Sequence, residues 1–220
     1  MFDLHSHSIL SDGELLPSEL ARRAEVVGLK GLVISDHVDA SNIDFVVPGL
    51  AEASRQLSGV MGLEVKAGAE LTHIPPAHMS RLVTRARELG AELVLVHGET
   101  IVEPVMPGTN RAGIESGADV LTHPGLITEE DAALAAKLGV RLEISARKGH
   151  SLTNGHIATV ARETGAVLVF GSDAHAPGDL LSRAEAEKVA LGAGLGPDEV
   201  QGLFEETERL FQGRKESLKR

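Results

Sequence analysis

Apolar runs alternate along this chain with longer stretches in which apolar residues recur at helical spacing. The spacing predicts helices over 18–27, 48–58, 78–89, 110–116, 128–138, 154–164, 182–191 and 198–212. Gly28 and Gly139 follow two of these stretches as expected C-caps, and Thr128 begins one as an expected N-cap. Short apolar runs predict strands over 2–4, 31–35, 60–69, 91–96, 118–122, 140–144 and 166–172. This alternation is typical of a parallel sheet covered by helices.

Nearly every predicted strand ends in a histidine or a carboxylate. These residues are His5, His7, His37, Glu70, His97, His123, Asp173 and His175, with Asp12 in the loop after the first strand. An open sheet gathers functional residues from a few strands at its switch point, whereas a closed barrel brings every carboxyl strand end to one mouth. The chain is therefore predicted to be a single α/β domain, a (β/α)7 TIM-like barrel over 1–196 with a C-terminal helix and tail over 197–220.

Composition narrows the classes of function. Hydrophobic residues make up 42% of the 220 positions, enough for one sizeable core, and no apolar run approaches the roughly 20 residues that span a bilayer. Cysteine is absent, so a thiolate-ligated zinc site is excluded. The net charge of −11 and the lack of Trp and Tyr disfavour long nucleic acids and anionic membranes as partners. The beginning of the chain lacks the pattern of a signal peptide, which predicts a cytoplasmic protein, and the oligomeric state is left open.

Six imidazoles and three carboxylates at one barrel mouth would be poorly paired without cations, so the sequence predicts a metal centre. Imidazole with carboxylate and no thiolate suits zinc, manganese or iron. Nine ligands exceed the needs of one ion and fit two or three. Three divalent ions would keep a net positive charge after the three carboxylates are counted, which suits a bound hydroxide and a phosphate dianion.

The ordered motifs resemble those of the PHP (polymerase and histidinol phosphatase) superfamily, histidinol-phosphatase-like members included. They are His5-Ser6-His7, Ser11-Asp12-Gly13, Asp36-His37, Gly68-Ala69-Glu70, His97, Thr122-His123-Pro124-Gly125 and Ser172-Asp173-Ala174-His175. The resemblance runs from Phe2 to about Pro177 and implies a distorted (β/α)7 barrel with a trinuclear site. It implies one metal on His5, His7, Glu70 and Asp173, a second on Glu70, His97 and His123, and a third on Asp12, His37 and His175.

Metal chemistry of this kind predicts a hydrolase, a phosphatase that cleaves a small phosphomonoester, histidinol phosphate or a similar metabolite, by attack of metal-bound hydroxide. Two alternatives stay open. One is a phosphodiesterase or exonuclease acting on short oligonucleotides or nucleotides. The other is a non-catalytic PHP-like binding subunit, which we would expect to lose ligands and gain basic charge.

Further residues are candidates for substrate contacts. Arg147 and Lys148 follow the sixth predicted apolar run and suit phosphate recognition, and Arg111 is a third candidate. Asp36 is interpreted as a partner that orients an imidazole. The acidic pair Glu99 and Glu103 either binds a cationic substrate group or is simply solvated.

The remaining histidines are interpreted as structural. His73 is read as a loop histidine after Glu70, and neither His150 nor His156 is expected to bind metal. The basic segment 213–220 is predicted to be a frayed tail.

Overall fold

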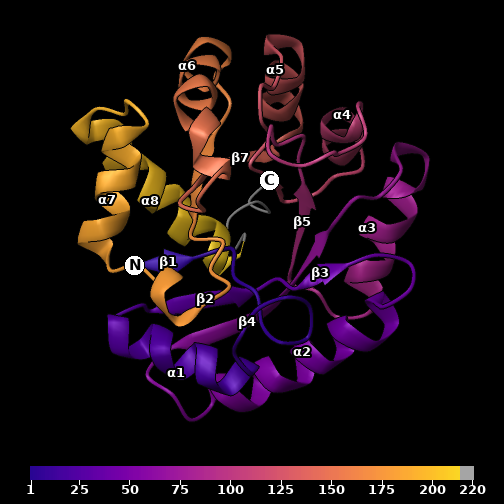
Figure 1. Cartoon of the computed structure of the whole chain (residues 1–220), viewed down its shortest axis with the longest axis vertical. Coiled ribbons are helices and arrows are strands. Elements are labelled where there is room, and N and C mark those ends of the chain that lie inside the picture. Colours follow the sequence, from indigo (N-terminus) through magenta and orange to yellow (C-terminus); the bar gives the residue numbers. More distant parts are fainter. Residues whose placement is uncertain (214–220) are drawn as a thin grey trace, which may run out of the picture.

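The computed structural model describes residues 1–213 and shows a parallel sheet enclosed by helices (Figure 1). Its strands are β1 (Phe2–Asp3), β2 (Gly31–Ile34), β3 (His37–Val38), β4 (Glu64–Leu71), β5 (Leu93–His97), β6 (Val120–Thr122), β7 (Arg141–Ser145) and β8 (Leu168–Gly171). The strand order is β1-β2-β4-β5-β6-β7-β8, and the short β3 pairs with the end of β4. Because every pairing is parallel, the carboxyl ends of the strands lie at one mouth.

The helices cover the outside of the sheet, as Figure 1 shows. They are α1 (Pro17–Val27), α2 (Ile43–Ser58), α3 (Met79–Glu88), α4 (Thr109–Glu115), α5 (Glu129–Leu138), α6 (Asn154–Thr164), α7 (Arg183–Gly192) and α8 (Pro197–Gln212), with 3-10 turns η1 (Pro76–His78), η2 (His150–Thr153) and η3 (Pro177–Asp179). None of the helices in the described part of the chain is both long and apolar enough to cross a membrane.

The segments that follow the first and last strands join the two edges of the sheet at the mouth. The Asp173 N–H donates to the His5 carbonyl at 2.9 Å, and the His7 N–H donates to the Ala174 carbonyl at 2.8 Å. Two residues before His5, the Asp3 carboxylate accepts the Ser172 N–H at 2.9 Å. The residues that follow β1 are thus bonded to those that follow β8, and the prediction of a TIM-like barrel is confirmed.

The opposite end of the barrel is filled by apolar side chains. Leu4, Val33, Leu95 and Val169 form a buried cluster that includes Phe211 of α8. The backbone of Gly31 lies so close to the Phe211 side chain that a Cβ at position 31 would be 2.5 Å from the phenyl ring. With one end packed in this way, polar ligands are confined to the mouth.

Several boundaries differ by a few residues from the sequence prediction, and the second predicted helix shows the largest shift. The helix expected to begin at Pro48 begins at Ile43, because the buried face of Ile43, Val46, Val47 and Leu50 continues across the proline. Proline is common in the first turn of a helix, which is why Pro48 indicated a start. The predicted frayed tail falls, from residue 214 onward, outside the described residues.

Candidate metal centre

The nine predicted ligands meet at the mouth, and we call them the histidine–carboxylate cluster. Its first group lies beside the closure of the barrel, where His5 and His7 point to the same side of an extended segment. Their Nε2 atoms are 2.9 Å apart. Glu70 Oε2 lies 3.3 Å from His5 Nε2 and 3.6 Å from His7 Nε2, and Asp173 Oδ1 lies 3.8 and 3.3 Å from the same two atoms. Four donor atoms therefore surround one small volume.

Glu70 joins this group to a second one. Its Oε1 atom faces the other way, 3.6 Å from His97 Nδ1 and 3.3 Å from His123 Nε2. The Thr122 hydroxyl donates to the same oxygen at 2.6 Å and fixes the plane of the carboxylate. Because Glu70 lies on β4 between β3 and β5, its two oxygens can serve ligand groups on both sides.

A third group lies toward solvent. Asp12 Oδ1 is 3.2 Å from His175 Nε2, 3.6 Å from His37 Nε2 and 4.0 Å from His7 Nδ1. The Asp12 side chain is 56% exposed, whereas those of His7 and Glu70 are fully buried. The cluster is therefore open on the side of this third group.

The loop that carries Asp12 is held by Asp36. The Asp36 carboxylate accepts the Ser8 N–H at 2.8 Å, the Ser8 hydroxyl at 2.6 Å and the Ser11 hydroxyl at 2.6 Å. The interpretation of Asp36 as a partner of an imidazole is corrected: its oxygens bind two serines instead. Gly13 also matters here, since a Cβ at this position would lie 2.3 Å from the His7 carbonyl oxygen.

Unpaired polar atoms test whether cations fit the cluster. Among the described residues, seven buried side-chain atoms lack a hydrogen-bond partner. Five of them belong to the cluster: His7 Nδ1, Glu70 Oε2, His123 Nδ1 and both ring nitrogens of His97. Buried polar atoms are nearly always paired in folded proteins, so this concentration is what a set of metal ligands would leave. The donor set fits zinc, manganese or iron.

The pKa values of the cluster histidines shift in both directions, because neighbouring carboxylates outweigh burial and raise the pKa of His5, His37 and His97. Burial lowers the pKa of His7 to about 3 and also lowers the pKa of His123, so both imidazoles are neutral. Burial alone would raise the pKa of Glu70, but His5 and His37 hold it well below its usual range. Burial likewise opposes ionisation of Asp173, whereas His5 and His7 lower its pKa. Ionised carboxylates and neutral imidazoles are the ligand forms of these groups.

Sequence reasoning missed Glu143. It lies fully buried on β7, and its Oε1 atom is 2.7 Å from His5 Nδ1. Its Oε2 atom accepts the His123 N–H at 3.0 Å. A carboxylate on the far nitrogen of a ligand histidine orients the ring and its lone pair. The sequence feature that could have identified Glu143 is its position as an acidic residue between Leu142 and Ile144 in a buried strand.

Space for this carboxylate depends on Gly171. A Cβ on Gly171 would lie 2.0 Å from Glu143 Oε1 and 2.8 Å from His5 Cβ. Only glycine leaves room for the Glu143 carboxylate against β8.

Two residues that the sequence did not assign as metal ligands lie at the rim of the cluster. The His150 ring is buried and stacks on His123 with a centroid distance of 4.0 Å. His150 Nδ1 lies 2.7 Å from the Thr100 hydroxyl, and its Nε2 lies 3.9 Å from Asp173 Oδ2. Glu103 reaches His97, with 3.1 Å between Glu103 Oε2 and His97 Nε2. The long loop after β5 therefore covers part of the cluster.

The loop acids and outlying histidines have distinct roles. The Glu99 carboxylate accepts the N–H groups of Gly108 and Asn110 at 3.0 and 2.9 Å, so it closes its own loop. His156 Nε2 lies 2.8 Å from the Ile127 carbonyl oxygen, which is a structural contact.

The predicted substrate cations lie in different surroundings. Arg147 pairs with Asp179 at 3.2 Å, and the same carboxylate accepts the His175 N–H at 3.0 Å, so Arg147 is linked to the open side of the cluster. Lys148 is exposed in the same loop. Arg111 instead pairs with Glu115, Glu130 and Asp131 on the outer helices, at 3.2, 3.0 and 2.9 Å. Three carboxylates of α4 and α5 therefore already pair with Arg111, and its contact with substrate stays a prediction.

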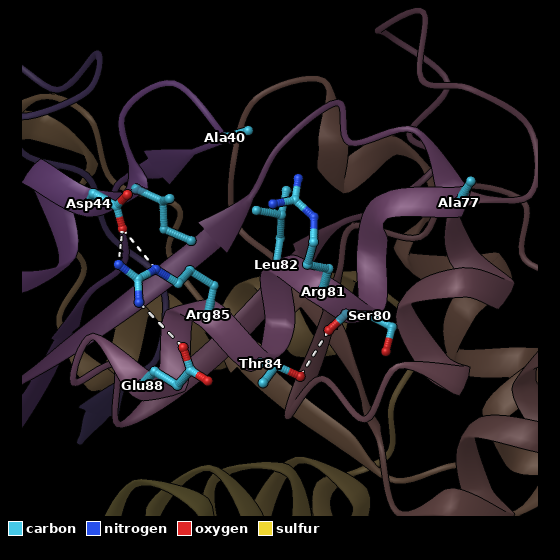
Figure 2. Close-up of a pocket in the computed structure, with 10 residues that line it drawn as sticks. Ala40, Asp44, Ala77, Ser80, Arg81, Leu82, Thr84, Arg85 and Glu88 are labelled. Atoms are coloured by element: carbon cyan, nitrogen blue, oxygen red, sulfur yellow. Dashed lines mark hydrogen bonds and ion pairs between the residues drawn. The ribbon is translucent and has the colours of Figure 1, made fainter.

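A separate surface pocket of about 570 Å³ lies between the start of α2 and α3 (Figure 2). Figure 2 shows Arg85 bonded to Asp44 of α2 and to Glu88 of its own helix. None of the nine cluster residues lines this pocket.

Comparisons with known proteins agree with the barrel fold. No family model matches the chain. It is 42% identical to the uncharacterized protein MJ1295 of Methanocaldococcus jannaschii, over 100% of this chain and 99% of that one. It is 28% identical to a protein of Shewanella frigidimarina named a probable phosphatase, over 80% of this chain and 77% of that one. The fold is similar, with a TM-score of 0.59 and 13% identity, to that of a Listeria monocytogenes protein whose proposed identity is the histidinol phosphatase hisK, over 82% of this chain and 97% of that one.

Proposed function

We propose that the chain is a metal-dependent phosphoesterase of the PHP type, which hydrolyses a small phosphomonoester with two or three divalent metal ions bound at the histidine–carboxylate cluster. The single observation that carries the proposal is the convergence of nine donor residues, four of which (His7, Glu70, His97 and His123) carry buried polar atoms without a hydrogen-bond partner. We propose zinc, manganese or iron as the ions.

The three groups of donors define which residues would hold each ion. His5, His7, Glu70 and Asp173 would hold the first, Glu70 with His97 and His123 the second, and Asp12 with His37 and His175 the third. Divalent ions, when bound there, would acidify water to form the nucleophile and offset charge on the phosphoryl oxygens. The opposite directions of the two Glu70 oxygens support a bridging role for this carboxylate.

Protein groups around the cluster would position the substrate. The open side of the third group, where Asp12 is exposed, is the direction from which a phosphoryl group can approach. The Arg147 guanidinium lies on that side, because Asp179 joins it to the backbone of His175. Arg147 and Lys148 would attract and orient the anionic ester. The stacked His150 and the Glu103 loop would limit water on the other side.

Histidinol phosphate or a metabolite of similar size is the substrate that we propose to test first. The net charge of −11 disfavours a long nucleic acid but admits a dinucleotide. A diester such as a short oligonucleotide is therefore the second candidate.

The experiment is a hydrolysis screen with purified protein loaded separately with manganese, zinc or iron. The substrates are p-nitrophenyl phosphate, phosphorylated metabolites and dinucleotides. Release of inorganic phosphate from monoesters supports the proposal, and release of nucleoside monophosphates from dinucleotides alone supports the diesterase alternative. Protein that carries metal but cleaves neither class would contradict both and favour a binding subunit.

A further inference from the structure

Three side chains outside the closed centre of the cluster meet at its rim, and we call them the rim site: His73, His97 and Glu103. His73 follows β4, His97 ends β5, and Glu103 lies in the loop after β5. Glu103 Oε2 is 3.2 Å from His73 Nε2 and 3.1 Å from His97 Nε2. The three donor atoms lie within 4.8 Å of one another, which is the spacing of ligands around one ion.

His97 presents one ring nitrogen to each site. Its Nδ1 atom faces Glu70 in the cluster at 3.6 Å, whereas its Nε2 atom faces Glu103 at 3.1 Å. Both nitrogens are buried and neither has a hydrogen-bond partner, so His97 Nε2 and the carboxylate are close without being aligned as a hydrogen bond. A buried nitrogen that is aimed at a carboxylate but not bonded to it indicates a missing third participant.

The local backbone sets His73 in place for this contact. Its φ of 52° lies in the left-handed region, which is uncommon for a residue other than glycine. The turn brings the His73 ring onto His97, with 5.3 Å between the ring centroids and 30° between their planes. Two imidazoles from separate segments therefore lie beside the same carboxylate.

A third histidine, His150, also lies close to the Glu103 carboxylate. His150 Nε2 lies 3.4 Å from Glu103 Oε1, the oxygen that does not face His97. Thr100 fixes the His150 ring through its other nitrogen. One oxygen of Glu103 thus faces His150, and the other faces both imidazoles of the rim site.

We infer that the rim site binds an additional divalent transition-metal ion, with Zn²⁺ as the best match. Two imidazoles and one carboxylate are a donor set found at zinc sites that keep an open position for water or substrate. The side chains of His73 and Glu103 are 43% and 36% exposed, so the open position faces solvent. The ion would place positive charge where an anionic substrate enters the mouth. This inference rests on the proposed function only through His97, which both sites share; with both ions bound, its ring would bridge them as an imidazolate and release its N–H proton to solvent.

The test compares wild-type protein with His73→Asn and Glu103→Gln. Asparagine tolerates the left-handed backbone at position 73, and glutamine keeps the shape of the side chain at 103. His78→Asn, a histidine on η1 outside the rim site, is the matched control. Each protein is dialysed to equilibrium against buffered zinc, and bound zinc per chain is measured by mass spectrometry. Cobalt-loaded samples are compared by their visible absorption.

We expect both rim variants to hold one ion fewer than wild type and to lose part of the cobalt absorption, while His78→Asn matches wild type. Equal zinc content in wild type, His73→Asn and Glu103→Gln would overturn the rim site, because the observed contact would then be hydrogen bonding alone. That result would not contradict metal binding at the histidine–carboxylate cluster. Wild-type protein that retains no zinc, manganese or iron would instead overturn the proposed function and the rim site together. If one rim variant fails to fold by circular dichroism, the other carries the comparison.

Discussion

His5 Nδ1 and Glu143 Oε1 lie 2.7 Å apart, and this contact ties the segment after the first strand to the centre of β7. The other Glu143 oxygen accepts the backbone N–H of His123. One buried carboxylate therefore fixes a ligand of the first group and a ligand of the second group. Burial raises the pKa of Glu143, although its contact with His5 opposes that rise.

We predict that Glu143→Gln weakens metal binding while the barrel stays folded. Glutamine has nearly the same shape but no charge, so it no longer increases the basicity of His5. Loss of such a partner typically lowers metal affinity by roughly 10- to 100-fold. Competition with a chelator measures the affinity, and circular dichroism checks the fold. Glu163→Gln, at an exposed position on α6, is the control and should bind metal as wild type does. Unchanged affinity in Glu143→Gln would show that the contact orients nothing.

A second prediction concerns Gly171, which leaves space for Glu143. In Gly171→Ala the new methyl group would meet Glu143 Oε1 at 2.0 Å, so the carboxylate or β8 must shift. We expect destabilisation of about 1–3 kcal/mol and a loss of metal affinity. Gly202→Ala in α8 is the control, because a Cβ there meets nothing within 4 Å. That change should stabilise the protein by about 0.5–1 kcal/mol. Urea unfolding of the two variants measures both effects, and equal stability would contradict the clash.

Much of the barrel could be predicted from the chain because its signals are local. Thr128 accepts the Asp131 N–H at the start of α5, as the capping pattern predicts. The histidines at the strand ends could also be predicted, because each one follows an apolar run in the sequence. Glu143 could not be found in this way, because its role depends on a partner 138 positions away. Asp36 was assigned to an imidazole for the same reason: its neighbour in sequence is His37, but its partners in space are serines.

A third prediction concerns Asp36, whose oxygens accept three hydrogen bonds from Ser8 and Ser11. In Asp36→Asn one acceptor oxygen becomes a donor, so at least one serine contact is lost. The loop that carries Asp12 should then loosen, at a cost of about 1–3 kcal/mol in the free energy of unfolding. We expect the metal content to fall by one ion, that of the third group, as measured by mass spectrometry. Loss of all bound metal would show instead that Asp36 supports the whole cluster.

A fourth prediction concerns pH and the surface pair of Glu199 and Arg162, which joins α8 to α6. Arg162 donates to the carboxylate at 2.8 Å and lowers the pKa of Glu199 to about 2 from an ordinary value of 4.5. The folded state therefore favours the ionised form. The resulting stabilisation should be fully present above pH 4.5 and be lost as the pH falls toward 2. Thermal unfolding should separate wild type from Glu199→Gln at neutral pH and bring the two together in acid. A constant difference at all pH values would contradict this sign.

The last prediction separates the metal role of His7 from its structural role. The backbone N–H of His7 closes the barrel by donating to Ala174, and this bond does not need the side chain. The imidazole, by contrast, faces the first group through Nε2 and the third group through Nδ1. We expect His7→Ala to lose at least one bound ion while its circular dichroism spectrum stays that of wild type. Chelator should lower the melting temperature of wild type more than that of the variant, since bound metal stabilises only the folded state that holds it. If His7→Ala unfolds without chelator, the ring itself supports the barrel, and the metal ions are secondary to the packing of the mouth.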